Sequence, residues 1–231
     1  MSGDSYRMRQ IAAVNELQER FDDGNRLLST VEKVSDYTDD GRVCLTAIAF
    51  VGDQLAHKLE PVIAKLRAIS PEHHYYSSDA LHLTIQNVRV IASPPNFDDS
   101  TIENAKVAFR KIVPEFSKQH FELSGLLVMP SSAAVVAYGE NDFFELCSQL
   151  RESLRAEGIP DDKDYIRDDV VFGNVTFCRY TEAPSYEFLE ELKCSKDAKF
   201  GSLVVDRVHL VAANSVLAPG YTKLLEKFYF K

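Results

Sequence analysis

The sequence predicts an α+β domain made of two similar lobes around a central groove, and three observations support this prediction. Stretches in which apolar and polar residues alternate indicate strands with one buried face, and apolar residues at three- and four-residue spacing indicate amphipathic helices. These elements follow one another as strand, helix, strand, helix, strand twice along the chain. Each occurrence also carries a short polar triplet at the same place. The repetition predicts a bilobal fold with pseudo-duplicated β-α-β-α-β lobes that form a central groove.

The first repeat begins near residue 45. Leu55, Leu59 and Leu66 fall at helical spacing in its first helix, and Pro114 is expected to end its second helix. The predicted elements are a strand at 45–51, a helix at 53–69, a strand at 81–86, a helix at 101–113 and a strand at 121–129.

The second repeat has the same frame. Gly158 follows its first helix directly, as is common at helix C-termini. From Thr46 to His82 there are 36 positions, and from Val135 to Asn174 there are 39, so the two repeats keep nearly the same spacing. The predicted elements are a strand at 133–138, a helix at 141–157, a strand at 171–178, a helix at 186–192 and a strand at 204–213.

A His-x-Thr triplet lies in the third element of the first repeat. His82 and Thr84 alternate with apolar residues there, so a strand projects both from one face, together with Gln86. In the second repeat Asn174 and Thr176 alternate with apolar residues in the same way. A lone triplet of this kind can arise by chance in a β-rich protein, but its repetition within a repeated frame favours a shared role.

These motifs resemble those of a known family. The stretches L-H-L-T-I-Q at 81–86 and F-G-N-V-T-F-C-R at 172–179 are similar to the two signatures of the two-histidine phosphoesterases, which include 2'-5' RNA ligase-like proteins and 2',3'-cyclic phosphodiesterases. The tail at 205–221, which ends in Gly-Tyr, resembles the closing strand of the family. The resemblance runs from about residue 45 to the C-terminus. It implies a bilobal α+β domain in which each lobe gives one His-x-Thr strand to a shared groove.

The chemistry of such a family explains the residue types. Opening a cyclic phosphodiester or a 2'-5' linkage requires a base for the nucleophile and an acid for the leaving alkoxide, and imidazoles with a pKa of about 6.5 serve both roles near neutral pH. The hydroxyls of Thr84 and Thr176 would hold the non-bridging oxygens. This chemistry demands no metal and no cofactor.

Asn174 stands where the family has its second histidine. A carboxamide donates and accepts hydrogen bonds but carries no proton at neutral pH. The loss of one general acid or base costs about 10²- to 10⁴-fold in rate unless another group replaces it. Three interpretations follow: a slow enzyme with one histidine, a rewired enzyme, or a binding protein on an enzyme scaffold.

Six further residues are candidates for the groove. His209 alternates with apolar residues and either replaces the missing imidazole from a neighbouring strand or is a half-buried strand histidine. Arg179 either meets a phosphate or is an exposed arginine at a strand end, and the same holds for Arg207. Tyr75 and Tyr76 either stack on a substrate base or tether a loop. The candidates are His209, Gln86, Tyr75, Tyr76, Arg179 and Tyr221.

Residues 1–42 lie outside the resemblance. Ile11, Val14, Leu17 and Phe21 recur at helical spacing, which predicts an amphipathic helix packed on a lobe, followed by a polar connector at 35–42. A partner-binding arm is the alternative. The expected organisation is a helical extension and connector at 1–42 and a single bilobal domain at 43–231, with lobe halves at about 43–130 and 131–231.

The composition predicts a soluble intracellular protein. Apolar residues make up 45% and charged residues 26% of the chain, which is ordinary for a globular domain. The four cysteines form no CxxC pair, which favours reduced thiols and a cytoplasmic location. No apolar stretch approaches the roughly 20 residues that a membrane span needs.

The net charge of −9 bears on the ligand. It repels long polyanions unless the groove is locally basic, so a small nucleotide or a short RNA end is favoured over a structured RNA. Nothing in the sequence indicates DNA, and the oligomeric state is not predicted. Two functions remain: a phosphodiesterase for 2',3'-cyclic or 2'-5' linked nucleotides, with His82 as proton carrier, or a module that binds a nucleotide or RNA end without turnover.

Overall fold

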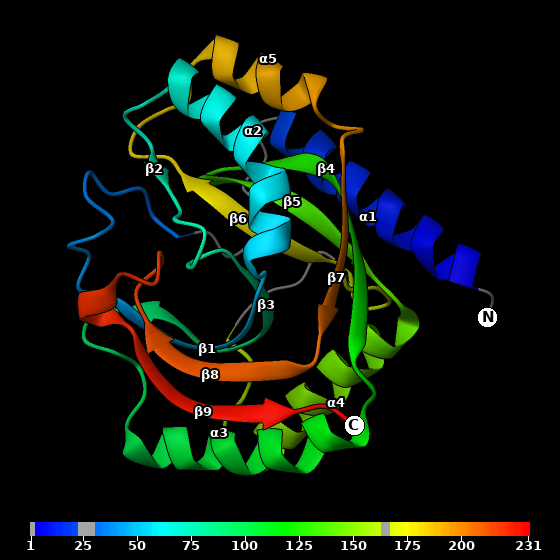
Figure 1. Ribbon diagram of the computed structural model, residues 1–231. Helices are drawn as coiled ribbons and strands as arrows, with labels where there is room; N and C mark the ends of the chain where they lie inside the picture. Colours follow the sequence, from blue (N-terminus) through cyan, green and yellow to red (C-terminus); the bar gives the residue numbers. More distant parts are fainter. Residues whose placement is uncertain (1–2, 23–30, 163–166) are drawn as a thin grey trace.

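The computed structural model describes residues 3–22, 31–162 and 167–231 (Figure 1). The helices are α1 (Gly3–Asp22), α2 (Asp53–Ile69), α3 (Asp99–Ile112), α4 (Asn141–Ala156) and α5 (Tyr186–Cys194), with short 3-10 turns η1 (Val113–Glu115) and η2 (Pro219–Tyr221). The strands are β1 (Val43–Phe50), β2 (His74–Tyr75), β3 (His82–Ala92), β4 (Gln119–Met129), β5 (Ser132–Gly139), β6 (Gly173–Arg179), β7 (Lys199–Val205), β8 (Arg207–Ala213) and β9 (Lys223–Tyr229). The α+β class and the twice-repeated order of elements are confirmed. No helix in the described ranges is long and apolar enough to cross a membrane.

The strands form one curled antiparallel sheet in the order β7-β4-β5-β6-β3-β1-β8-β9, with β2 paired to β6 (Figure 1). The two sequence halves are therefore not two separate sheets. A two-residue turn joins β4 to β5, and so short a connection makes the two strands antiparallel neighbours. The chain then bends at Asp206, so β7 pairs with β4 whereas β8 pairs with β1. The single strand predicted at 204–213 is thus divided between β7 and β8. Strand β4 of the first half pairs with β5 and β7 of the second half, and β8 of the second half pairs with β1 of the first half.

Helices α2 to α5 bury one face of this sheet in a continuous core. The apolar residues at three- and four-residue spacing in α2 and α4 account for their buried faces. At the far edge, Phe109 of α3 stacks on Phe228 of β9 with ring centroids 5.4 Å apart. The other face of the sheet is left for the polar residues of the two triplets.

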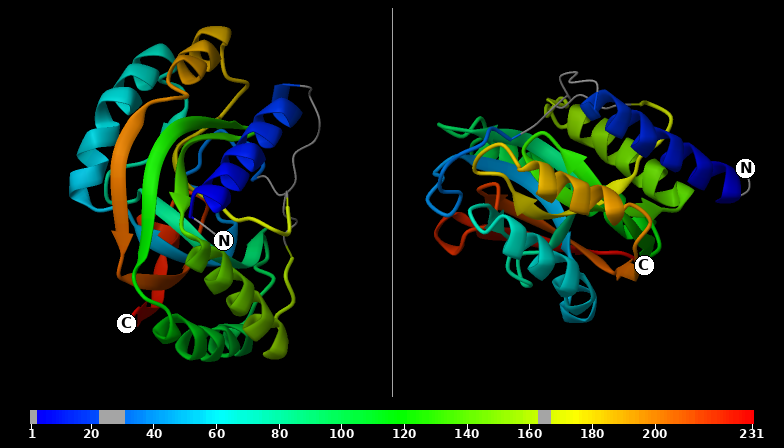
Figure 2. Two further views of the ribbon diagram at one scale, coloured as in Figure 1. Left: turned by 90° about the vertical axis from the view of Figure 1, so that its right-hand side faces the viewer. Right: turned by 90° about the horizontal axis from the view of Figure 1, so that it is seen from above.

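Helix α1 lies across that other face, on the opposite side of the sheet from α2 (Figure 2). Val14 and Leu17 pack on a separate apolar cluster formed by Leu127, Ala134 and Val136. Gln18 also binds both backbone groups of Val128, donating to its carbonyl at 2.9 Å and accepting from its N–H at 3.2 Å. The expectation that the N-terminal segment packs as a helix on a lobe agrees with this arrangement.

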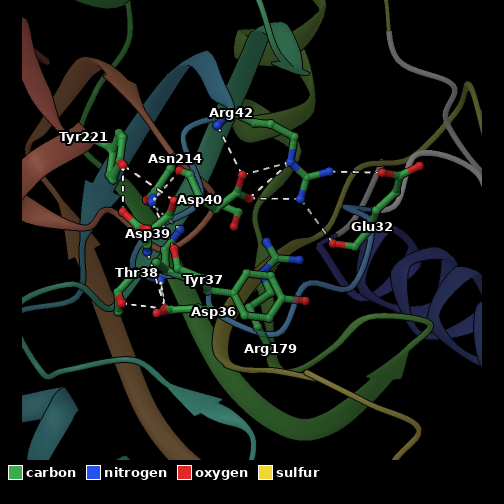
Figure 3. Close-up of polar contacts among 12 residues, drawn as sticks. Glu32, Asp36, Tyr37, Thr38, Asp39, Asp40, Arg42, Arg179, Asn214 and Tyr221 are labelled. Atoms are coloured by element: carbon green, nitrogen blue, oxygen red, sulfur yellow. Dashed lines mark hydrogen bonds and ion pairs between the residues drawn. The ribbon is translucent and has the colours of Figure 1, made fainter.

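The connector at 35–42 is fastened to the loop after β8 by Asn214, which is 1% exposed (Figure 3). Its Nδ2 donates to the carbonyls of Tyr37 and Asp40 at 3.0 and 3.1 Å. Its Oδ1 accepts from the N–H groups of Val216 and Ala218 at 3.2 and 3.0 Å. One buried carboxamide therefore satisfies four backbone groups and holds two distant segments together.

Replacing Asn214 by aspartate is expected to destabilise the protein by about 3 kcal/mol or more. The carboxylate keeps both acceptor bonds but faces two buried carbonyls with no donor, and each unsatisfied buried group costs about 1–3 kcal/mol. Urea denaturation measures the free energy of unfolding. Asn141→Asp is the matched control, because Asn141 is exposed at the start of α4, and it should change stability by less than about 0.5 kcal/mol. Equal losses in the two variants would contradict the assigned role of Asn214.

Candidate functional site

The two triplets meet at the seam between β3 and β6. Leu83, the middle residue of the first triplet, pairs with Val175, the middle residue of the second. In an antiparallel pair this register sets His82 beside Thr176 and Thr84 beside Asn174, with facing Cβ atoms about 4.5–5.5 Å apart. His82 and Asn174 are then diagonal partners at roughly 7–8 Å. The four polar side chains form a compact square on one face of the sheet.

This square opens into a cavity of about 420 Å³. The cavity lies between the seam, the turn after β4, Val31 and the loop after β8. Of the residues predicted from sequence, it contains His82, Thr84, Asn174, Thr176 and Arg179.

The imidazole of His82 is held in one tautomer. Its Nδ1 lies 2.8 Å from the carbonyl oxygen of Ala80, and because a carbonyl only accepts, Nδ1 carries the proton and Nε2 keeps a lone pair. The pKa of His82 is lowered to about 4, mainly by burial. The hydrogen bond to Ala80 opposes this shift, and the positive charge of Arg179 contributes to it. His82 is therefore neutral at physiological pH and has the protonation state of a base.

The second triplet has no proton carrier but is ordered. The hydroxyl of Thr176 donates to Oδ1 of Asn174 at 3.4 Å. Thr176 is buried, whereas Asn174 is partly exposed to the cavity. This arrangement leaves the amide nitrogen of Asn174 available as a donor to a bound oxyanion.

Arg179 lies at the end of β6, where it pairs with Ser132 of β5 and His74 of β2. Its Nε donates to the hydroxyl of Tyr76 at 3.3 Å, and that hydroxyl donates in turn to the carbonyl of Ser215. The guanidinium is thereby fixed at the cavity wall, where an anion would contact it.

Two expected groove residues lie elsewhere for reasons of strand register. Thr84 pairs with Ile48 but Gln86 pairs with Ala47, so β3 carries one extra residue there, a β-bulge that breaks the alternation. Gln86 is consequently 4% exposed and lies outside the cavity. His209 shares the face of the square, but β1 lies between β3 and β8. His209 is therefore two strand spacings, or about 10 Å, from Thr84. Of the two interpretations of His209, the half-buried strand histidine agrees with this position.

The three tyrosines expected in the groove also lie outside the cavity and hold its surroundings together. Tyr75 donates to the carbonyl of Ser70 at 2.9 Å, and Tyr221 donates to Asp39 at 3.0 Å (Figure 3). Tyr76 is 3% exposed and packs near the ring of His82 at a centroid distance of 6.0 Å. Of the two interpretations for the pair at 75–76, tethering of the loop agrees with these contacts.

The cavity also contains residues that the sequence did not single out. Most are short polar side chains at turns and strand ends, where no periodic pattern marks them. They are Thr46, Asn87, Ser131, Ser132, Asp162 and Asn214. Ser215, the serine of the tail at 205–221, also lines the cavity. Val31, which precedes the connector and lies outside the resemblance, also lines the cavity.

The fold matches solved structures along nearly their whole length. TT0787 of Thermus thermophilus is 18% identical, with a TM-score of 0.58, and the match covers 81% of this chain and 97% of that one. A protein described as a phosphoesterase is 14% identical with a TM-score of 0.55, covering 82% and 99%. Escherichia coli LigT in complex with 3'-AMP is 16% identical with a TM-score of 0.52, covering 83% and 99%. The chain therefore has the fold of the LigT-like two-histidine phosphoesterases.

Comparison by sequence alone gives no match: no protein-family model and no curated protein sequence matches the chain. The part of this chain that the structural matches leave uncovered is similar in size to residues 1–42.

Proposed function

We propose that the protein is a phosphodiesterase that acts on 2',3'-cyclic phosphate or 2'-5' linked nucleotide and RNA ends, with catalysis altered by Asn174. The observation that carries this proposal is the pairing of Leu83 with Val175, because it brings the two triplets to one phosphate-sized square. LigT structures with the same fold hold 3'-AMP and ATP, which supports a nucleotide ligand.

His82 acts as the general base. Its free Nε2 takes a proton from water as the water oxygen attacks phosphorus, and the bond between phosphorus and the 2' oxygen breaks. Because the low pKa keeps the ring neutral, no proton has to leave it first. A base with so low a pKa is weak, which limits the rate.

Thr84 donates to one non-bridging oxygen, and the hydroxyl of Thr176 turns from Oδ1 of Asn174 to donate to the other. Arg179 balances the charge that grows on them. The amide of Asn174 donates a hydrogen bond to the leaving 2' oxygen but transfers no proton to it. Water in the cavity then supplies that proton. The predicted enzyme is therefore slower than one with two histidines.

The alternative is a binding protein that holds a nucleotide or RNA 3' end without turnover. The replacement of the second histidine by Asn174 favours it, because binding requires only donors and a cation. Both functions place the phosphate in the same cavity.

Turnover of a panel of 2',3'-cyclic nucleotides and 2'-5' dinucleotides separates the two. Wild type is expected to open at least one substrate, and His82→Gln should reduce kcat/KM by about 10²-fold or more. His57→Ala is the matched control, since that imidazole is exposed on α2 and lies outside the cavity, and it should turn over like wild type. If wild type and His82→Gln were equally inactive yet both bound 3'-AMP, the protein would be a binding module.

The pH dependence gives an independent readout. Since His82 must be neutral to act, kcat/KM should be lost as pH falls through about 4 and stay flat across neutral pH. A bell-shaped profile centred near pH 6.5 would contradict this mechanism, because it would require a second imidazole.

A further inference from the structure

A row of side chains continues from the cavity across β1, β8 and β9. Phe50 pairs with His82, so its ring lies on the same sheet face as the square, and it packs edge-on against His209 at 5.1 Å between centroids. His209 pairs with Lys227, and Arg207 pairs with Tyr229. We call this row the open strip; it consists of Phe50, Arg207, His209, Lys227 and Tyr229.

The open strip presents rings and cations to solvent. Phe50 is 40% and Tyr229 54% exposed, so both rings present surface to solvent on this face. The guanidinium of Arg207 lies 5.2 Å from the centre of the Tyr229 ring, and Lys227 is exposed beside it. Burial lowers the pKa of His209, with Lys227 and Arg207 acting in the same direction, so its ring is neutral.

Carboxylates are turned away from the open strip or paired at its end. Glu226, next to Lys227 in sequence, faces α3 and forms a two-pronged ion pair with Arg110. Asp206 accepts from Arg207 through both carboxylate oxygens at 2.8 Å. Lys227 is exposed and takes no part in this ion pair. The strip is therefore locally favourable to an anion, although the whole chain carries a charge of −9.

On the other side of the cavity, over β4 and β5, helix α1 covers the sheet. Ala134 pairs with Thr176 and Val136 pairs with Asn174, so both share the face of the square, and α1 covers them with Val14 and Leu17. A ligand larger than the cavity is therefore excluded from β4 and β5. On β1 and β8 it is limited to the strand ends at Phe50 and His209, because Leu217 packs on the buried Ile48, Val211 and Ala213 of the same face.

We propose that the open strip binds the nucleotides that precede a terminal phosphate, so that the ligand is a single-stranded RNA end of about two to four nucleotides. The proposal rests on the proposed function, since the terminal phosphate occupies the cavity. Exposed rings that stack on bases, together with cations along the backbone, are the usual means of binding single-stranded nucleic acid. From β3 at the cavity to β9 at the far end of the strip there are three strand spacings, about 14 Å, which matches about four stacked bases.

The test compares two ligands that are not turned over: 3'-UMP and a uridine tetranucleotide with a 3'-phosphate. Wild type is expected to bind the tetranucleotide at least about 10-fold more tightly. Tyr229→Ala should weaken tetranucleotide binding by about 5- to 100-fold and leave 3'-UMP unchanged, because each base stacked on a ring adds a comparable amount. Lys227→Ala should lower the salt dependence of tetranucleotide binding alone. Tyr186→Ala is the matched control, since this ring is 79% exposed on α5, away from the strip.

Equal affinity for both ligands, or a Tyr229→Ala variant that binds the tetranucleotide like wild type, would overturn the proposal. Failure of the proposed function looks different. In that case Arg179→Ala would leave the binding of 3'-UMP unchanged, because the cavity would not be the phosphate site. The strip and the cavity are thus tested by separate variants and separate ligands.

Discussion

Asn174→His is expected to raise the rate of 2',3'-cyclic phosphate opening by about 10²- to 10⁴-fold, the usual contribution of one general acid or base. Asn174 is the diagonal partner of His82 across the seam, so an imidazole there flanks a bound phosphate on the side opposite to the base. It is partly exposed to a cavity of about 420 Å³, and the larger ring therefore enters open space rather than the core.

The pH profile should change together with the rate. The introduced imidazole must be protonated to give its proton to the leaving oxygen, whereas His82 must stay neutral. Activity should therefore rise as pH increases through about 4 and fall again above the pKa of the new imidazole, near the ordinary value of about 6.5. Steady-state kinetics from pH 3.5 to 9 would show the change from a plateau to a bell.

Asn174→Gln is the control, because it keeps the amide and adds no proton carrier. It should not accelerate turnover. If Asn174→His also failed to do so while binding 3'-AMP like wild type, position 174 would not lie beside the leaving oxygen, and the cavity would be a binding site whose geometry does not support catalysis.

Local patterns predicted most of the fold. The helix predicted at 53–69 has those bounds in the structure, because its apolar spacing and its flanking residues mark both ends. The strand with the His82 triplet was likewise visible, since one buried face imposes an alternation of two. Apolar periodicity and flanking residues depend only on neighbours in sequence, so they can be read without knowledge of the tertiary structure.

Features that depend on distant partners were not predictable in this way. The bulge that turns Gln86 into the core reflects its pairing with β1, which no pattern in 81–86 reveals. The exchange of β4 and β8 between the halves depends on the short turn at 130–131 and on the bend at Asp206. The sequence left two interpretations of His209 open for the same reason, because strand order decides which strand is a neighbour.

The residues of the cavity also divide into those that local patterns predict and those that depend on distant partners. The triplets are recognisable because they repeat, whereas Asn214 lies in an irregular loop with no periodicity. Residues 1–42 were expected to be an accessory helix and a connector. In the structure α1 covers the sheet beside the square and Val31 lines the cavity, so the extension limits the size of the site.

Gly173→Ala is expected to disturb the seam on which the site depends. A Cβ at this position would overlap Cδ1 of the fully buried Leu83 and lie 3.4 Å from Cβ of Ala137. Overpacking of this kind costs about 1–3 kcal/mol. Because Leu83 is the residue that pairs with Val175, relief of the clash shifts β3 relative to β6 and separates His82 from Thr176. A misplacement of about 1 Å lowers catalysis by roughly 10²-fold, so kcat/KM should fall more than stability alone explains.

A double-mutant cycle with Leu83→Val isolates this contact. Valine lacks the δ carbons that meet the new methyl group, so the double variant should regain about 1–2 kcal/mol of unfolding free energy relative to the sum of the single changes. Turnover should recover with it. Gly220→Ala is the matched control, since a Cβ there has no heavy atom within 4 Å, and it should be close to neutral. Additive effects of Gly173→Ala and Leu83→Val would show that the close approach at Gly173 does not set the spacing of β3 and β6.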